Sequence, residues 1–404
     1  SAVGPTVDNG GNVFSMINGE SDDQYKLTEF INHQTWISDA VFIGVLMCVG
    51  IIGNLLILGA VIVTKKLRNT TNVFVCNVAV SDLFVAGYVL PTIFGNIIKQ
   101  GSILSIPVCV FTACVLLTSC GVSLISFAMI AFNRYISICH HGRYARIFPT
   151  RSVVIMVVLV WVFSLTTVVV GLIPGVCIHF YHHAQIVCTF NNRLSAIYTF
   201  CLICIGIVAP SCLTGSFYFA IYTKIKTTGQ KVRSHTSGAL SSAMVARQQK
   251  ENRAILCMFL AYLIFVVLWF PFGMVVLIDI YYPVHPLLFR IVGWLAFSNS
   301  CVDWIVYGAM NNHFKDAYKN ILTCFRRKRK VATSSADVES NSRLTRGRSH
   351  QVIAVVGTAT MTTTYHEGRS IDCVEYLVCL ILSINQVCTT RVLFSSFCCA
   401  WFCY

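Results

Sequence analysis

The fold is decided by an apolar run that begins at residue 106. Residues 106–139 read IPVCVFTACVLLTSCGVSLISFAMIAFNRYISIC, with one formal charge, at Arg134. A bilayer core about 30 Å thick is crossed by about 20 apolar helical residues. Because a helix satisfies its own backbone hydrogen bonds in lipid, we expect this run to form a membrane-spanning helix.

Six further runs of the same kind lie on either side of it. The seven expected spans cover residues 38–64, 72–98, 106–139, 152–174, 194–223, 254–278 and 286–310. Strands of a membrane barrel would alternate apolar and polar residues over about ten positions, whereas these runs are continuous. The sequence therefore predicts an all-α membrane protein, built as a seven-transmembrane helix bundle.

The composition agrees with a lipid environment. Of the 404 residues, 56% are hydrophobic and 11% are charged, whereas a soluble domain has about 45–50% apolar and about 25% charged residues. A soluble globular protein and a disordered chain are both excluded, because too little charge is present to cover a surface that faces water.

The excess of cations indicates topology. There are 30 Lys and Arg residues against 16 Asp and Glu residues, a net charge of +14. The cations gather in alternate loops and after the last span: Lys65, Lys66, Arg68, Arg143, Arg146, Arg151, Lys224, Lys226, Arg253 and the run at 326–330. By the positive-inside rule, the N-terminus lies outside and the tail is cytoplasmic, and no nucleic-acid partner is needed to explain the charge.

Two acidic residues lie deep inside the expected spans, Asp82 and Asp303. A charge at the bilayer centre costs at least about 2.5–3.5 kcal/mol, so such residues face the bundle interior. Two neighbouring carboxylates repel unless a cation lies between them. Since Ser123 and Asn299 lie at comparable depth, we expect Asp82, Ser123, Asn299 and Asp303 to form a Na⁺ site. The alternative is a hydrogen-bond network in which both acids are protonated.

The sixth expected span contains a hinge pattern. Pro271 removes one backbone hydrogen bond and kinks the helix. Trp269 lies two residues before it, and Phe265 lies one turn before Trp269. We expect this segment to adopt two packings.

A second switch is expected at the end of the third span, where Asn133, Arg134 and Tyr135 follow one another. Glu251 lies at the same end of the sixth span and could pair with Arg134. Breaking that pair would release the sixth helix and open a cytoplasmic cavity.

In order and spacing, the motifs resemble those of rhodopsin-like (class A) G-protein-coupled receptors. They are Gly53-Asn54, Asn77-Val78-Ala79-Val80-Ser81-Asp82, Cys109, Asn133-Arg134-Tyr135, Trp161, Pro210 with Tyr218, Leu268-Trp269-Phe270-Pro271, and Asn299-Ser300-Cys301-Val302-Asp303-Trp304-Ile305-Val306-Tyr307 followed by Phe314. Together they cover residues 40–323.

Within that family the chain looks most like melatonin-type receptors and their invertebrate orphan relatives. The residues that show this likeness are Ile138-Cys139-His140, Tyr144, Cys188-Thr189-Phe190, Asn299-Ser300-Cys301 and Tyr307-Gly308. Gly171 and Asn192 depart from the Asn and Gln of melatonin receptors, which puts melatonin itself in doubt as the ligand. Trp304 replaces the usual Pro, so we expect no proline kink there.

The resemblance implies further roles. Cys109 and Cys188 match the family's disulfide. Leu116 replaces the Asp that aminergic receptors require, and Phe297 replaces the Lys that opsins require. By family position, the ligand pocket would be lined by Leu116, Cys120, Phe190, Trp269, Gly273 and Val276. Arg134, Tyr218 and Tyr307 would line the cytoplasmic cavity.

The expected protein is a receptor of the plasma membrane, not an enzyme, with no cofactor other than Na⁺. It would pass binding of a neutral or aromatic small molecule to a heterotrimeric G protein of the inhibitory type. Arrestin and a receptor kinase would bind the tail. A peptide receptor of the same fold, or an ion or proton transporter, remains an alternative.

Four regions are expected along the chain. Residues 1–37 form the extracellular N-terminus, 38–311 the membrane domain, 312–324 an amphipathic helix on the inner membrane face, and 325–404 the tail. Residues 227–249 form a Ser/Gly/Ala-rich loop. Cys324 is a palmitoylation candidate or an unmodified Cys. Residues 373–404 turn apolar again, as a lipidated tail or a stretch added by read-through.

Overall fold

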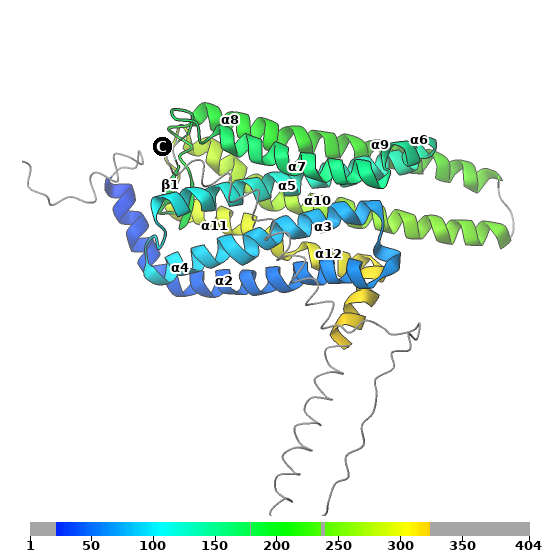
Figure 1. The fold of residues 1–404 in the computed structure, drawn as a ribbon, viewed down its shortest axis with the longest axis horizontal. Coiled ribbons are helices and arrows are strands. Elements are labelled where there is room, and N and C mark those ends of the chain that lie inside the picture. Colours follow the sequence, from blue (N-terminus) through cyan, green and yellow to red (C-terminus); the bar gives the residue numbers. More distant parts are fainter. Residues whose placement is uncertain (1–21, 178, 236–238, 324–404) are drawn as a thin grey trace, which may run out of the picture. The chain divides into compact units, whose positions relative to one another are not determined.

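A computed structural model of the chain describes residues 22–177, 179–235 and 239–323 (Figure 1). Of the described residues, those up to 318 form one compact unit and residues 319–323 belong to a second. The first unit is a bundle of helices that contains the expected spans.

The helices of this bundle follow one another along the chain with short breaks. They are α2 (Asp22–Val63), the 3-10 turn η1 (Lys65–Leu67), α3 (Thr70–Phe84), the π-helical turn η2 (Val85–Val89), α4 (Leu90–Lys99), α5 (Ile106–Cys139), α6 (His141–Ile147), α7 (Thr150–Val170), α8 (Ala196–Ile203), the π-helical turn η3 (Cys204–Val208), α9 (Ala209–His235), α10 (Ala239–Asp279), α11 (Pro286–Phe297), the 3-10 turn η4 (Ser298–Cys301) and α12 (Asp303–Met310). Residues 312–323 are helical as well.

The seven expected spans are present as a seven-transmembrane helix bundle. Within the described residues, six helical segments are long and apolar enough to cross a membrane. The seventh span is made by α11 and α12, which the turn η4 separates. With Trp rather than Pro at residue 304, we expected no kink in the seventh span. The turn η4 nevertheless interrupts this span. The side-chain amide of Asn54 donates to the Ser300 carbonyl at 2.8 Å and supports the irregular turn.

The first helix is longer than predicted. It begins at Asp22, whereas hydropathy placed its start at residue 38. Its 42 residues span about 63 Å, roughly twice the thickness of the hydrocarbon core. Thr28 and Ile31 are buried in this added segment. Contacts of these side chains with other parts of the chain explain why this polar segment is helical.

The loop expected at residues 227–249 is also largely helical. Helix α9 continues to His235 and α10 begins at Ala239. The small-residue composition suggested a loop, but the stretch after Ala239 is rich in Ala, Arg and Gln, which have high helix propensity.

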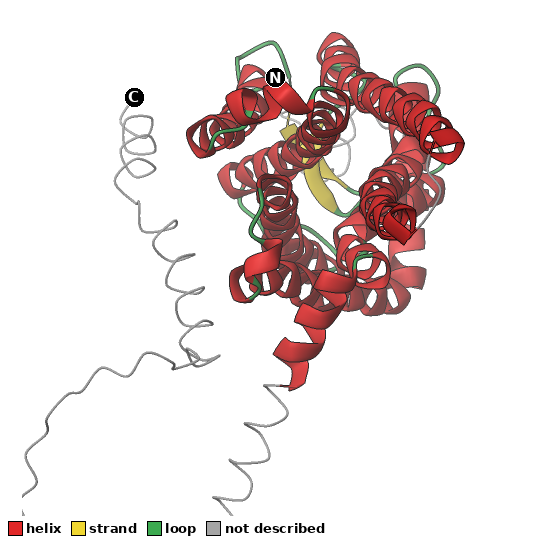
Figure 2. Ribbon diagram, turned by 90° about the vertical axis from the view of Figure 1, so that its right-hand side faces the viewer, coloured by secondary structure: helices red, strands yellow, loops and turns green. Residues whose placement is uncertain are grey.

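A β-hairpin crosses one end of the bundle, inside the ring of helices (Figure 2). Strand β1 (His179–His182) pairs antiparallel with β2 (Val187–Phe190), with Tyr181 opposite Cys188. The predicted disulfide between Cys109 and Cys188 is confirmed and ties β2 to α5. We call this the hairpin end of the bundle and the opposite end, where α6 lies, the Arg134 end.

A close approach joins the first helix to the last. A Cβ atom on Gly53 would lie 1.9 Å from the indole Cδ1 of Trp304. Only glycine therefore lets α2 pack against α12 at this height, because the indole of Trp304 occupies the space that a side chain at residue 53 would need.

Candidate ligand and ion site

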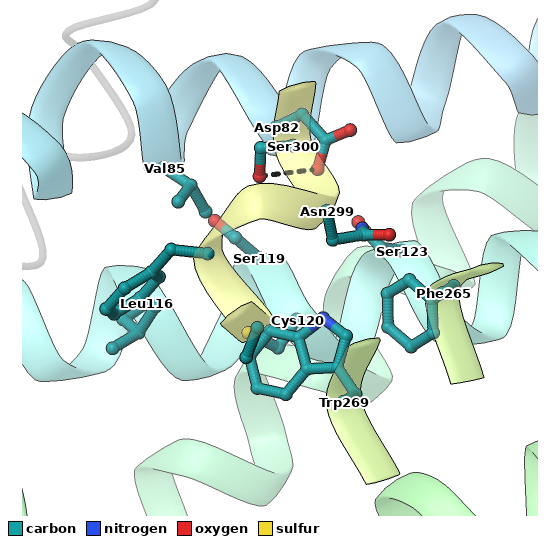
Figure 3. A pocket seen from close by; sticks show the side chains of 12 residues that line it. Asp82, Val85, Leu116, Ser119, Cys120, Ser123, Phe265, Trp269, Asn299 and Ser300 are labelled. Carbon is teal, nitrogen blue, oxygen red and sulfur yellow. Dashed lines mark hydrogen bonds between the residues drawn. The ribbon is translucent and has the colours of Figure 1, made fainter. Parts of the chain in front are cut away.

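A cavity lies inside the bundle, between α5, α10 and the interrupted seventh helix (Figure 3). It has a volume of about 10 Å³, close to the minimum for one water molecule, and is lined by Asp82, Val85, Leu116, Ser119, Cys120, Ser123, Phe265, Trp269, Ala296, Phe297, Asn299 and Ser300. Apolar and aromatic side chains form most of this lining. Polar oxygens gather on one side of it, around Asp82.

Local irregularities of the backbone place these oxygens. Asp82 lies in the last turn of α3, directly before the π-helical turn η2, and such turns occur frequently at functional sites. Asn299 and Ser300 lie in the 3-10 turn η4. The hydroxyl of Ser300 donates to Asp82 Oδ1 at 3.2 Å, and Ser123 shares a 2.7 Å hydrogen bond with Ser81.

Several buried polar atoms of the cavity have no hydrogen-bond partner within the described part of the chain. They include Asp82 Oδ2, Asn299 Oδ1 and Trp269 Nε1. An unsatisfied buried polar group costs about 1–3 kcal/mol, and more if it is charged. Carboxylate and amide oxygens are ligands that hard cations prefer, so this donor set suits Na⁺.

Asp303 is buried, but it does not line the cavity. Neither of its carboxylate oxygens has a hydrogen-bond partner among the described residues. Asp82 and Asp303 are both buried in the bundle, at 2% and 1% exposed. Of the four residues predicted to hold the ion, the structure brings Asp82, Ser123 and Asn299 together and leaves Asp303 just outside.

The residues predicted to bind ligand fall into two groups. Leu116, Cys120 and Trp269 line the cavity. Phe190, Gly273 and Val276 lie outside its lining. The ring of Phe190 packs edge-on against Tyr198, with ring centres 5.6 Å apart, and Val276 belongs to an apolar cluster with Phe289.

The aromatic residues of the predicted hinge in α10 contact one another and α5. The rings of Phe265 and Trp269 stack at 5.9 Å, and Phe265 also contacts Phe127 of α5 at 5.4 Å. Pro271 lies inside the same helix, which continues through it to Asp279. The aromatic stack therefore connects the cavity to the interior on the side of the Arg134 end.

At the Arg134 end, Asn133 joins three elements. It is fully buried, accepts a 2.7 Å hydrogen bond from Thr71 of α3 and donates at 3.4 Å to the hydroxyl of Tyr144 in α6. Tyr135 bonds His140 at 3.0 Å and stacks on Phe217.

The guanidinium of Arg134 points toward the sixth helix. Its Nε donates to the sulfur of Met258 in α10 at 3.3 Å. Tyr218 and Tyr307 are buried nearby, and their hydroxyls have no hydrogen-bond partner among the described residues. The side chain of Glu251, the predicted partner of Arg134, and Cys324, the predicted lipidation site, lie outside the described residues.

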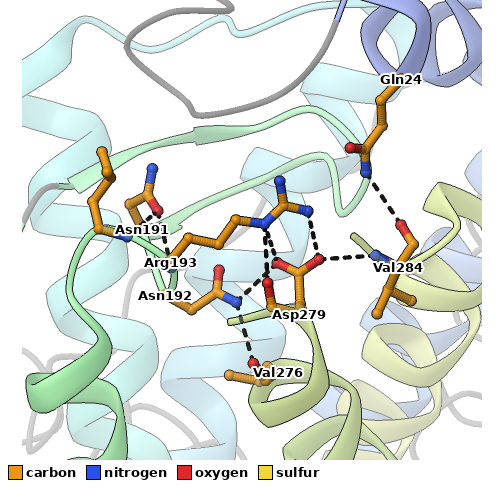
Figure 4. A network of polar contacts seen from close by, with 8 residues as sticks. Gln24, Asn191, Asn192, Arg193, Val276, Asp279 and Val284 are labelled. Atoms are coloured by element: carbon orange, nitrogen blue, oxygen red, sulfur yellow. Dashed lines mark hydrogen bonds and ion pairs between the residues drawn. The ribbon is translucent and has the colours of Figure 1, made fainter. Parts of the chain in front are cut away.

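The hairpin end contains a polar network that joins the segment after β2 to the end of α10 (Figure 4). Arg193 forms an ion pair with Asp279 at 2.7 Å, and Asn192 donates to the same carboxylate at 2.9 Å. The backbone N–H of Val284 donates to it as well, at 3.1 Å. The side-chain amide of Asn192 also donates to the Val276 carbonyl at 3.2 Å, so it is directed at α10 rather than at the cavity.

A second ion pair at this end was missed by the sequence reasoning. Arg290 of α11 and Asp39 of α2 are both buried and lie 3.1 Å apart. Asp39 and Arg290 each lie near the start of an expected span, 38–64 and 286–310, and neither was assigned a role. The signal that could have found them is that each interrupts an otherwise apolar run.

The sequence and the fold are similar to those of known membrane proteins. Residues 53–307 match the family described as "7 transmembrane receptor (rhodopsin family)". The fold is similar to that of squid rhodopsin, with a TM-score of 0.65 and 19% sequence identity over 71% of this chain and 85% of that one.

Curated relatives are similar over most of the bundle. The melatonin receptor type 1A of Ovis aries is 30% identical over 283 residues, which cover 68% of this chain and 74% of that receptor. The melatonin receptor type 1B-B of Danio rerio is 28% identical over 294 residues, which cover 71% of this chain and 82% of that receptor.

Proposed function

Because the chain belongs to the rhodopsin family of seven-transmembrane receptors and is related to melatonin receptors, we propose that it passes the binding of an extracellular ligand to a heterotrimeric G protein. The hairpin end faces the outside, where a disulfide persists. The Arg134 end faces the cytoplasm, in agreement with the cations of its loops.

The ligand is a neutral, partly aromatic small molecule. The lining of the cavity supports this proposal because most of it is apolar or aromatic, with Leu116, Cys120 and Trp269 among the residues predicted for ligand binding. Because the cavity itself has room for about one water molecule, the surrounding helices would move apart to admit the ligand. Phe190, Gly273 and Val276 would contact a ligand that extends toward the hairpin end. Melatonin itself remains disfavoured, since Asn192 is bonded to α10 and Gly171 offers no side chain.

A peptide ligand is less well supported. It would need charged anchors at the extracellular end, and the ion pairs with Asp279 and Asp39 already engage Arg193 and Arg290. A transporter would use Asp82 and Asp303 as an ion path, but the family match and the melatonin-receptor relatives favour a receptor.

A Na⁺ ion binds beside Asp82 in the proposed inactive receptor. Asp82, Ser123 and Asn299 would hold it, with Asp303 supplying further negative charge. The unpartnered oxygens Asp82 Oδ2 and Asn299 Oδ1 support this proposal. The positive charge of the ion would offset the repulsion between the carboxylates of Asp82 and Asp303.

Activation would proceed through the stack of Phe265 and Trp269 and the hinge at Pro271. Movement of α10 would separate Arg134 from Met258 and from the proposed partner Glu251. Arg134, Tyr218 and Tyr307 would then line a groove for a helix of the G protein. Asn133 and Tyr135 would hold the end of α5 in register with α6.

The G protein is of the inhibitory type by analogy with the relatives. Arrestin and a receptor kinase would act on the Ser/Thr-rich tail, and palmitoylation of Cys324 would fix the tail to the inner membrane face. The protein is proposed to lie in the plasma membrane.

The proposal depends on one observation: residues predicted to bind ligand (Leu116, Cys120 and Trp269) and residues predicted to bind an ion (Asp82, Ser123 and Asn299) line the same cavity. Trp269 also stacks on Phe265 in the helix that contains Pro271. The test uses purified protein in sealed vesicles with added inhibitory G protein and a library of neutral aromatic compounds. Ligand-dependent nucleotide exchange supports the receptor. Electrogenic ion flux without exchange would support the transporter instead.

A further inference from the structure

We propose that Arg290 is the positioning residue that holds the hairpin tip (residues 183–186) between the cavity and the extracellular end. The inference rests on the proposed function only in assigning the cavity to a ligand. It concerns how that cavity is reached.

The hairpin tip is inserted among the helices rather than spread over them. Ala184, Gln185 and Ile186 are each at most 5% exposed. Ala184 belongs to an apolar cluster with Val276 of α10 and Phe289 of α11. The side chains of the tip thus fill space between the sixth and seventh helices that a ligand would otherwise enter.

The backbone of the hairpin tip is held in a costly conformation. Ile186 has a φ of +57°, which is an outlier for a β-branched residue. Its N–H donates to the His182 carbonyl at 2.8 Å and closes the turn. Such a conformation is unfavourable in itself and persists only where surrounding contacts determine it.

Arg290 supplies the central contact. Its Nε donates to the Ala184 carbonyl at 3.0 Å. Its Nη1 donates to Thr35 at 2.8 Å and to Asp39 at 3.1 Å, and its Nη2 donates to Asn32. One buried guanidinium therefore joins the hairpin tip to the seventh helix and to the outer part of α2.

Two more amides bind carbonyls of the tip. Asn32 donates to the His183 carbonyl at 3.4 Å, and Asn96 of α4 donates to the Ile186 carbonyl at 3.3 Å. These bonds are long compared with those of Arg290, and neither donor carries a charge. Hydrogen bonds to charged groups stabilise a fold more than hydrogen bonds between neutral groups. Of the three side chains that donate hydrogen bonds to carbonyls of the tip, Arg290 therefore stabilises it most.

The tip is continuous with the lining of the cavity. Ile186, Val187 and Leu116 belong to one apolar cluster, and Cys120 packs against it. Leu116 and Cys120 also line the cavity. A water-soluble reagent that reaches Cys120 from the extracellular end must therefore pass the hairpin tip, which makes the thiol of Cys120 a reporter of its position.

The test measures how fast Cys120 reacts in the full-length receptor, purified and placed in lipid nanodiscs. The probe is 2-(trimethylammonium)ethyl methanethiosulfonate, and mass spectrometry gives the rate at each cysteine separately. Cys257 is the internal reference, because it is buried near the Arg134 end, where its thiol donates to the Val306 carbonyl. No ligand or G protein is used, so the result does not depend on the test of receptor function.

We expect Arg290→Ala to raise the rate at Cys120 by about tenfold or more, the factor that corresponds to 1.4 kcal/mol, without changing the rate at Cys257. Thr35→Val removes only one acceptor of Arg290 and should give a smaller rise. Arg290→Lys keeps the charge beside Asp39, but the shorter set of donors on Lys cannot bond all the acceptors of Arg290. This variant should therefore also raise the rate at Cys120. Lys99→Ala, at an exposed cation of the same end, is the matched control and should leave the rate unchanged.

Equal rises at Cys120 and Cys257 would overturn the proposal, because they would show a general loosening of the bundle. If Arg290→Ala does not fold, Thr35→Val and Arg290→Lys decide the matter. Unchanged rates at Cys120 in both of these folded variants would also overturn it.

Discussion

The phenol ring of Tyr198 fills the space where a side chain on Gly171 would lie. A Cβ atom at residue 171 would be 2.7 Å from both Cζ and the hydroxyl oxygen of Tyr198. The hydroxyl donates to the Thr167 carbonyl at 3.1 Å, which fixes the ring between α7 and α8. At the position where the resemblance predicts an Asn in melatonin receptors, this chain therefore has a glycine whose missing side chain is replaced by an aromatic ring.

Gly171→Ala should destabilise the receptor by about 1–3 kcal/mol, the usual cost of overpacking. Combining it with Tyr198→Leu should recover part of that loss, because the shorter side chain vacates the space. Thermal unfolding of the purified single and double variants measures the coupling. Gly215→Ala is the matched control, since a Cβ there meets nothing within 4 Å. Additive losses in the double variant would contradict the packing relationship.

The helices and much of the cavity could be predicted from the sequence, because both follow from local rules. Asp82 is conspicuous as a charge within an apolar run, and Trp269 and Pro271 form a pattern within three residues. The broken seventh helix was missed because its turn is supported by Asn54, which is 246 residues away in the chain.

The hairpin end could not be predicted for the same physical reason. Arg290 and Asp39 are 251 residues apart, and Arg193 and Asp279 are 86 apart. Their pairing arises from the folded arrangement of helices and leaves no periodic pattern. The helical start of α2 at Asp22 depends on the same contacts, since hydropathy detects lipid-facing residues but not a polar helix that packs on protein.

Asp82→Asn should abolish stabilisation by Na⁺. In the unmodified receptor, a bound ion stabilises the fold by about 1.4 kcal/mol when its concentration is ten times its Kd, and the melting temperature rises accordingly. The measurement compares melting temperatures in NaCl and in choline chloride at equal ionic strength, with KCl as a second control. Asn preserves the shape but removes the charge that attracts the ion. A Na⁺-dependent rise that persists in Asp82→Asn would remove the basis for the ion site.

Cys188→Ala should reduce the amount of folded receptor at the cell surface. Loss of a disulfide that closes a loop of 79 residues costs about 2–5 kcal/mol, and β2 would lose its covalent link to α5. Surface labelling of an epitope-tagged receptor measures the loss. Cys177→Ala is the control, because Cys177 lies in the same loop outside this disulfide. Equal surface levels for Cys188→Ala and the unmodified receptor would be incompatible with a structural role for the bond.

His182 should make the fold sensitive to acid. Burial lowers the pKa of its imidazole from 6.5 to about 4; Asp279 opposes this shift, while His183 and Arg193 add to it. The neutral ring accepts a hydrogen bond from the Gln185 N–H at 3.4 Å and packs on Phe289 at 4.9 Å. Protonation would remove this acceptor and place a second cation close to Arg193.

The sign of the effect follows from the lowered pKa. Below pH about 6.5 the unfolded chain binds a proton at His182, while the folded protein does not until pH about 4. Stability should therefore be complete above pH about 6.5 and fall as the pH drops toward 4. His182→Gln cannot titrate, and the other acids and histidines are common to both proteins. The difference between their melting temperatures as a function of pH consequently isolates His182. We expect the unmodified receptor to lose more stability than His182→Gln across this range, and parallel pH profiles would contradict the burial of a neutral imidazole at the hairpin end.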